Sequence, residues 1–554
     1  MGSVVRKVYC GPARIISSLG QSTLENYLGV DNYMTNSTQL SDGTPVCLID
    51  KRKLDLTALE SYTFVEQLSL ITLNDVMARS RITLDNKRTL LIISTTKGNI
   101  DYLKDDLGRS QLWAMANRLE AYFKCINKPV IVSNACVSGI AAVIMGTRLI
   151  EQEKYDHVYV VGVDVASEFV VSGFKSFKSI SPTVCKPYDL SRDGLTLGEG
   201  CGAMLLTSNG ELSESKVVVS GGGISDDANH ISGPSRTGDG LAFAIEAAMS
   251  EAQLKASDIS FINAHGTGTS FNDEMESRAF TLLSLTDIPC NSLKPYLGHT
   301  LGASGVMEII LSAEQLKNDH LFGIKGYSEN GVPFELNVSD THRNIKLTHC
   351  LKTASGFGGT NAAVILSKDS MAKVRYKCDV SASIVEAGSV EILKSESPFA
   401  EFIRSEYKTL GETNLKFFKM DNLSKLGYVA SCKLMSEITL EYPMDRIGIV
   451  LANRNSSLDT DLNHQNILDQ HMPEGVSPAV FVYTLANIVA AEIAIRQKFQ
   501  GELMMFVSEH KEMCFLKEYS HGLINDNRCD AVVYGWCDLL DENYNTELKL
   551  IKRV

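Results

Sequence analysis

The chain has 554 residues, of which 44% are hydrophobic, and its formal net charge is −13. This acidic balance, without any run of Lys and Arg, argues against nucleic acid as a partner, because phosphate binding needs concentrated positive charge. The thirteen cysteines are scattered and none lies in CxxC spacing, which favours reduced thiols. No apolar run reaches the ~20 residues of a membrane span, and the start lacks the apolar core of a secretory signal. We therefore expect a cytoplasmic protein.

Short runs rich in Val, Ile and Leu predict buried strands in the first two thirds of the chain. One set lies at 90–95, 129–133, 157–163 and 202–207, and a second at 216–223, 260–264, 287–291, 351–354 and 362–367. Helical patterns separate them at 109–125, 137–152, 238–253, 274–284 and 302–317. This alternation predicts an α/β fold with a sheet covered on both faces, and the two similar sets indicate two duplicated halves.

Cys136 lies in VIVSNACVSGIAAVIMG, where a strand pattern changes to a helix pattern. A thiol at a helix N-terminus feels the positive end of the helix dipole, which favours the thiolate. The small neighbours Ala135, Ser138 and Gly139 would let a substrate approach closely. The alternative is a buried structural cysteine, the commonest fate of a free thiol.

Two further patches supply imidazoles. His265 lies in FINAHGTGTSFNDEMES, at a predicted strand end, where Thr267 and Thr269 offer hydroxyls to an amide-bearing substrate arm. Lys294 and His299 share the segment NSLKPYLGHTLGASG, whose glycines predict a tight turn before a helix. The alternatives are a hydrogen-bonded loop histidine and a solvated surface lysine.

Phe357 lies in SGFGGTNAA, where the flanking glycines permit backbone conformations closed to other residues. Its N–H could pair with that of Cys136 as an oxyanion hole. An ordinary glycine turn is the alternative. A metal site is not expected, because the two histidines lack a third ligand at a recognisable spacing and Lys294 would oppose a cation.

Together these four patches resemble the β-ketoacyl-acyl-carrier-protein synthases, over residues 1–368. The resemblance implies the five-layered αβαβα thiolase-like fold of two duplicated halves. It implies a decarboxylative Claisen condensation of an acyl thioester with malonyl carrier protein, without any cofactor beyond the phosphopantetheine of the acyl carrier protein. Fatty-acid, type II polyketide and aryl-polyene pathways all remain open.

The resemblance also implies the roles of individual residues. Cys136 would be the nucleophile, His265 and His299 would face the malonyl carbonyl, and Lys294 would hold the arrangement. Thr267 and Thr269 would line the pantetheine tunnel, and Phe357 would gate two acyl chambers. Structural support would come from Asp273, Glu276 and Asn361.

Two alternatives concern the class of protein, and one expectation concerns its assembly. A thiolase or a coenzyme-A-priming synthase is the nearest rival enzyme. A non-catalytic partner, like the chain-length-factor subunits of ketosynthase heterodimers, is the rival from another class. The family forms dimers, so we expect a homodimer or a ketosynthase-type heterodimer.

The pattern changes near residue 370, and the four patches do not recur after it. Residues 446–461 (RIGIVLANRNSSLDTD) echo 89–103, and residues 478–495 (PAVFVYTLANIVAAEIAI) echo 129–146. Superposing the second pair places Leu485 at the position of Cys136. We therefore predict two domains: a ketosynthase module at 1–370, and at 371–554 an additional α/β half-module, degenerate and inert in covalent catalysis.

Overall fold

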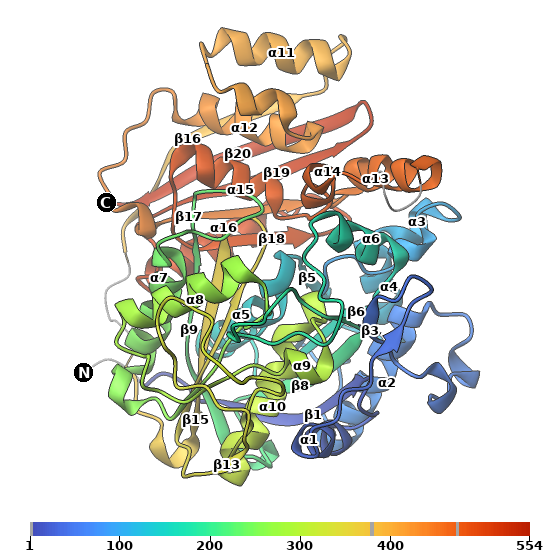
Figure 1. Ribbon diagram of the computed structural model, residues 1–554. Helices are drawn as coiled ribbons and strands as arrows, with labels where there is room; N and C mark the ends of the chain where they lie inside the picture. Colours follow the sequence, from blue (N-terminus) through green and yellow to red (C-terminus); the bar gives the residue numbers. More distant parts are fainter. Residues whose placement is uncertain (1–3, 377–381, 472–475) are drawn as a thin grey trace.

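A computed structural model describes residues 4–376, 382–471 and 476–554 (Figure 1). Most strands belong to one fifteen-stranded sheet, in the order β11-β10-β14-β15-β9-β1-β8-β6-β4-β5-β18-β17-β19-β20-β16. We call residues up to 370 the head and residues from 371 the tail. Across the described ranges, no helix combines the length and the apolar character that a bilayer crossing requires.

The head contains the same five-strand arrangement twice. The first half has β1 (Val8–Ser17), β4 (Thr89–Ser94), β5 (Val130–Val132), β6 (His157–Asp164) and β8 (Gly200–Thr207). The second has β9 (Val217–Asp226), β10 (Phe261–Asn263), β11 (Cys290–Asn291), β14 (His349–Ser355) and β15 (Thr360–Lys368). If the strands of each half are numbered 1 to 5 in chain order, both halves show the order 1-5-4-2-3 across the sheet. Equivalent neighbouring strands are parallel in both halves or antiparallel in both. The predicted duplication is confirmed.

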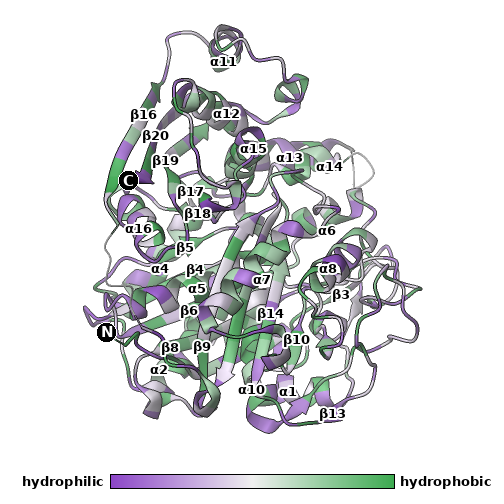
Figure 2. Cartoon of the chain, turned by 90° about the vertical axis from the view of Figure 1, so that its left-hand side faces the viewer, coloured by the Kyte–Doolittle hydropathy of each residue, from purple (hydrophilic) through white to green (hydrophobic). Residues whose placement is uncertain are grey.

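Helices separate and cover the two halves. α5 (Ser138–Glu151) and α10 (Ser304–Asn318) pack between the strands of both halves, and every residue of α5 is buried. α2 (Phe64–Ser80) covers the outer face of the first half with α4 (Leu112–Phe123) beside it, and α7 (Asp239–Ala252) covers that of the second with α8 (Ser270–Leu282) beside it. Figure 2 shows the hydrophobic strands enclosed in this way. The head therefore has the five-layered thiolase-like fold.

The tail carries the five-strand arrangement a third time. Its strands are β16 (Ile384–Leu393), β17 (Ile447–Asn453), β18 (Leu503–Val507), β19 (Ala531–Leu540) and β20 (Asn543–Arg553). Read from β16 inward, they follow the same ranked order, and β18 pairs antiparallel with β5, Phe506 opposite Val132. The head and tail sheets are thus continuous at the junction of β5 and β18 (Figure 1).

Alternate residues of the tail strands face two different helix layers. Ile449, Leu451 and Val533 pack in one core with α12 (Asn422–Met435) and α15 (Ile488–Gln497). Val450 and Val532 pack in another core with α16 (Met513–Asn525). This is the period of two expected of a sheet that is buried on both faces.

The sequence superposition of 478–495 on 129–146 is wrong. Pro478–Val482 forms α14 rather than a strand, and the tail counterpart of β5 is β18. Proline suits the first turn of a helix, and a five-residue apolar run does not distinguish strand from helix by periodicity. Leu485 therefore lies between α14 and α15. In the tail, residues 508–512 follow β18 in the way that the Cys136 segment follows β5.

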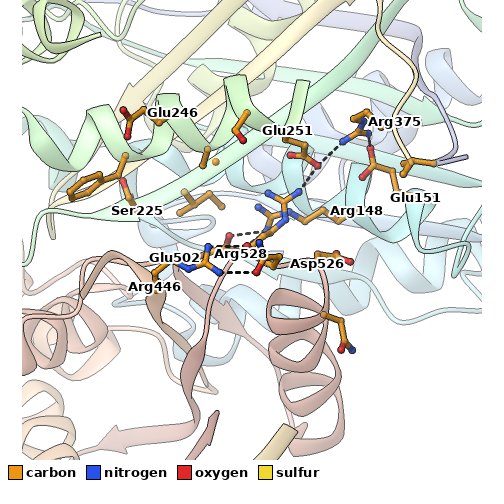
Figure 3. Close-up of a pocket in the computed structure, with 18 of the residues that line it drawn as sticks. Arg148, Glu151, Ser225, Glu246, Glu251, Arg375, Arg446, Glu502, Asp526 and Arg528 are labelled. Atoms are coloured by element: carbon orange, nitrogen blue, oxygen red, sulfur yellow. Dashed lines mark hydrogen bonds and ion pairs between the residues drawn. The ribbon is translucent and has the colours of Figure 1, made fainter. Parts of the chain in front are cut away.

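Buried ion pairs tie head and tail together beside a pocket of about 900 Å³ (Figure 3). Arg148 of α5 donates from Nη1 to both carboxylate oxygens of Glu502, at 2.7 and 2.8 Å. Glu251 of α7 pairs with Arg375, at 2.7 Å, and with Arg528 of the tail. These groups are nearly excluded from water, so they fix the orientation of the tail more firmly than surface pairs would.

Candidate active site

Cys136 lies in a single 3-10 turn, Ala135–Val137, between β5 and α5. Ala135 has φ +48°, a left-handed conformation that costs a non-glycine residue about 1–3 kcal/mol. Burial raises the pKa of the Cys136 thiol to about 12, and the nearby Lys294 offsets this only in part. Burial of Cys136 therefore works against the thiolate that its place at a helix N-terminus would favour.

His299 presents an N–H group to this sulfur. Its Nε2 lies 3.2 Å from the Cys136 Sγ. Its Nδ1 accepts the backbone N–H of Leu301 at 3.3 Å, which assigns the ring proton to Nε2. Burial and the positive charge of Lys294 hold the pKa of His299 well below its usual value. The imidazole is therefore neutral, and it can stabilise negative charge on sulfur or on an incoming oxygen.

His265 lies beside His299, with the ring centroids 5.2 Å apart and nearly perpendicular. Burial is the main cause that holds the pKa of His265 well below its usual value, and the charge of Lys294 is the second. Two carboxylates fix its loop: Glu276 accepts the backbone N–H of His265 at 2.8 Å, and Asp273 accepts that of Thr267 at 3.1 Å. The loop is thus held by charge-assisted hydrogen bonds.

Lys294 is fully buried, so the surface alternative is wrong. Its Nζ donates to the carbonyl of His265 at 2.6 Å and to Glu308 at 3.0 Å. Glu308 also pairs with Lys352, at 2.5 Å, and Lys352 reaches the Ala264 carbonyl at 3.2 Å. Sequence reasoning missed Glu308 and Lys352, because a single Lys in a strand and a single Glu in a helix carry no local sign of pairing.

The Phe357 loop approaches Cys136 closely. A Cβ on Gly356 would lie 3.2 Å from the Cys136 backbone nitrogen, so glycine permits this approach. Gly356 donates to the Thr360 carbonyl at 2.9 Å, which closes the turn. Asn361 accepts from Ser355 at 2.7 Å and braces the loop from β15. Thr267 and Thr269 hydroxyls lie 2.8 Å apart beside the His265 loop.

The structure supplies the third potential metal ligand that the sequence lacked. One ligand atom from each of Cys136, His265 and His299 lies within 4.8 Å of the others. The donor set nevertheless fits a metal ion poorly, since His299 directs a proton rather than a lone pair at the centre. The buried ammonium of Lys294 nearby also opposes a cation.

The structure thus brings Cys136, His265 and His299 together and places Gly356 against the Cys136 backbone, while the other predicted residues lie in or support the loops that carry these groups. The arrangement offers a nucleophile, two neutral imidazoles and a close backbone turn, held by a buried Lys–Glu–Lys group. Such a site can form a thioester and stabilise an oxyanion or enolate. The individual catalytic roles stay predictions.

Sequence comparisons agree with this class of site. Residues 60–211 match the β-ketoacyl synthase N-terminal domain, and residues 217–324 match its C-terminal domain. These two segments of the head are therefore similar to the two domains of the β-ketoacyl synthases. It is 32% identical over 256 residues to the tetracenomycin polyketide synthase ketoacyl synthase alpha subunit of Streptomyces glaucescens, which covers 43% of this chain and 59% of that protein.

A second relative is the 3-oxoacyl-[acyl-carrier-protein] synthase 2 of Vibrio harveyi, 30% identical over 256 residues, or 43% of this chain and 61% of that protein. The chain thus spans about three fifths of the length of the curated relatives that it matches. A chain of the complex between the ketosynthase ApeO and its chain length factor ApeC, from Xenorhabdus doucetiae, is similar with TM-score 0.57 and 25% identity, over 65% of this chain and 98% of that chain.

One solved structure resembles head and tail together. The PfaC ketosynthase–chain length factor aligns with TM-score 0.76 over 99% of this chain and 78% of that chain, at 14% identity. This likeness concerns the fold, and it includes the tail in the same arrangement of sheets.

Proposed function

We propose that the protein is a β-ketoacyl-acyl-carrier-protein synthase. The Cys136 sulfur attacks the acyl thioester of an acyl carrier protein and takes the acyl group, and the pantetheine sulfur of the carrier leaves as a thiol with the proton that Cys136 loses. Malonyl carrier protein then enters past Thr267 and Thr269, and loses carbon dioxide. His265 and His299 stabilise the resulting enolate, whose carbon attacks the acyl thioester and releases the Cys136 thiolate. The observation that carries this proposal is the 3.2 Å contact between His299 Nε2 and the Cys136 sulfur beside a second neutral imidazole.

The high pKa of the resting thiol sets a requirement on the loading step. Deprotonation of Cys136 must occur as the acyl thioester approaches, since the buried site disfavours a standing thiolate. The N–H of His299 stabilises that thiolate once it forms. The backbone N–H groups of Cys136 and Phe357 are the proposed donors to the tetrahedral oxyanion, each worth about 3 kcal/mol in such sites.

We also propose that the tail is a catalytically inert half-copy that takes the place of a partner subunit. The tail strands follow the same order across the sheet as the strands of each half of the head, and β18 pairs antiparallel with β5. Both observations support this assignment. The alternative, a wholly non-catalytic chain-length-factor-like protein, is disfavoured because Cys136, His265 and His299 are all present and adjacent.

The deciding experiment is intact mass after mixing the protein with acyl carrier proteins charged with a ladder of acyl chains. We expect one acyl adduct in the native protein and none in Cys136→Ala. Cys185→Ala is a matched control, because Cys185 is an equally buried head thiol and should leave the adduct intact. No adduct with any donor, or an adduct that persists in Cys136→Ala, would refute the proposed nucleophile.

A further inference from the structure

A row of aromatic side chains leads from the candidate active site into the tail. The Phe357 ring stacks on Phe174, with centroids 6.0 Å apart, and on Phe177, at 5.3 Å. Phe481 of α14 continues the row, 5.4 Å from Phe174. We call these four rings the aromatic row. It belongs to one apolar cluster that includes Leu301 of the head and Leu458 of the tail.

Phe481 fits this row only because position 173 is glycine. A Cβ on Gly173 of α6 (Glu168–Ser176) would lie 2.1 Å from the Phe481 ring. The tail helix α14 is thus seated directly on the head helix that bears Phe174. The region is filled by side-chain rings, so a chain that entered it would have to turn these rings away from their present rotamers.

The row ends at a buried histidine whose one neighbouring backbone partner, at Phe169, leaves part of its hydrogen-bonding capacity unused. His464 of α13 (Leu458–His471) is fully buried, 5.5 Å from the Phe481 ring and 4.4 Å from Phe169. Within the described part of the chain, neither ring nitrogen makes a well-aligned hydrogen bond. The Phe169 backbone approaches the ring, yet burial and the charge of Lys97 hold the pKa of His464 to about 4. The ring is therefore neutral at physiological pH.

The positive charge next to His464 is the ammonium of Lys97, and its hydrogen bonds are already made. The ammonium of Lys97 contacts Asp461 at 2.6 Å, Ser457 at 3.3 Å and the carbonyl of Thr484. These three acceptors use its three protons.

Among the described residues, His464 is left without a well-aligned partner at this end of the row, as Asn487 Oδ1 is beside Phe357 at the other end. A neutral imidazole offers one donor and one acceptor. An unpaired buried polar group normally costs about 1–3 kcal/mol, so its presence calls for an explanation.

We propose that the tail end of the aromatic row receives the far end of the acyl chain, and that His464 hydrogen-bonds a neutral polar group there. The substrate class is an acyl chain with a hydroxyl, aliphatic or aromatic, at its far end. A carboxylate is disfavoured, because the ring is neutral and Lys97 is already paired with Asp461. This inference rests on the proposed acylation of Cys136.

The test compares two ladders of acyl carrier protein thioesters, one ending in methyl and one in hydroxyl, at each chain length. The readout is the ratio of acylation rates, from intact mass over time. At the length that reaches His464, we expect the hydroxyl chain to react roughly three- to tenfold faster, the effect of one hydrogen bond. In His464→Leu the ratio should fall to about one, while His464→Gln, which keeps a donor and an acceptor, should restore part of it.

Controls separate this inference from the proposed function. His521→Leu, at a histidine on α16 outside the aromatic row, should keep the native ratio. The absence of adducts in both ladders would overturn the proposed function itself. Adducts that form without a hydroxyl preference at any length, or a preference that survives in His464→Leu, would overturn the assignment of His464 alone. If His464→Leu does not fold, failure of His464→Gln to retain any preference overturns it equally.

Discussion

At the scale of single residues, the feature that organises the site is a carboxylate shared by two buried lysines. Burial alone would raise the pKa of Glu308, but Lys294 and Lys352 outweigh it and hold that pKa below its usual value. Because Lys294 also holds the His265 carbonyl, the position of this imidazole depends on a group that need not touch substrate.

Glu308→Gln should destabilise the protein by about 3–5 kcal/mol, because it leaves two buried ammonium groups without their counter-charge. The measurement is the free energy of unfolding in denaturant. Glu314→Gln is the matched control two turns further along α10: its pair with Lys317, at 3.4 Å, is partly exposed, so we expect less than about 1 kcal/mol. Equal effects of the two substitutions would contradict the buried Lys–Glu–Lys group.

His464 should give the protein a specific pH dependence of stability. Its folded pKa of about 4 lies below the ordinary value of 6.5, so between these values the unfolded chain binds more protons. Stability that is present above pH ~6.5 is therefore lost as the pH falls toward 4, by an amount on the order of 3 kcal/mol. The difference in unfolding free energy between native protein and His464→Leu should change over this window and stay constant above pH ~7. A difference that is independent of pH would show that His464 titrates normally.

At the scale of elements, the packing of α14 on α6 shows what the sequence could and could not predict. The head strands and helices were predictable, because parallel strands buried on both faces give continuous apolar runs separated by helices. The four patches indicated the candidate site through their joint resemblance to the β-ketoacyl-acyl-carrier-protein synthases, and the structure brings Cys136, His265 and His299 together. The run PAVFV misled, because its apolar residues suit a buried strand and a buried helix equally. Nothing in α14 alone shows that its Phe481 meets a glycine more than three hundred residues earlier.

Gly173→Ala should test this contact directly. The added methyl overlaps the Phe481 ring, and overpacking of this kind costs about 1–3 kcal/mol. Phe481→Ala should relieve the clash, so the double variant should be more stable than the sum of the single effects predicts. Gly522→Ala in α16 is the control, since its added methyl meets mainly the flexible side chain of Gln152 at 3.1 Å. Additive effects in denaturant unfolding would mean that α14 does not rest on α6.

At the scale of the whole molecule, head and tail share a surface that combines sheet pairing with buried ion pairs. β5 is paired on both edges, by β4 and by β18, so the strand edge that could join a second copy is occupied. A dimer in which β5 pairs with a strand of a second copy at this edge is therefore incompatible with the tail in its present place.

Arg148→Met should show how much the Arg148–Glu502 ion pair stabilises the contact between head and tail. It leaves the carboxylate of Glu502 buried without its guanidinium, which costs about 3–5 kcal/mol, whereas the double variant with Glu502→Gln should recover part of that loss. Arg52→Met, at a fully exposed pair with Asp50, is the control and should change stability little. Thermal unfolding followed by circular dichroism is the measurement, and full additivity of the double variant would contradict a coupled pair.

The continuity of β5 with β18 has a consequence for how the two parts meet. Because one polypeptide carries both strands, their association is intramolecular and is governed by an effective concentration that the linker sets, of millimolar order for short flexible connections. Two separate chains joined by the same strands would come apart on dilution, as mass action requires. Here the contact between head and tail should persist at any protein concentration, and the ratio of head to tail is fixed at synthesis.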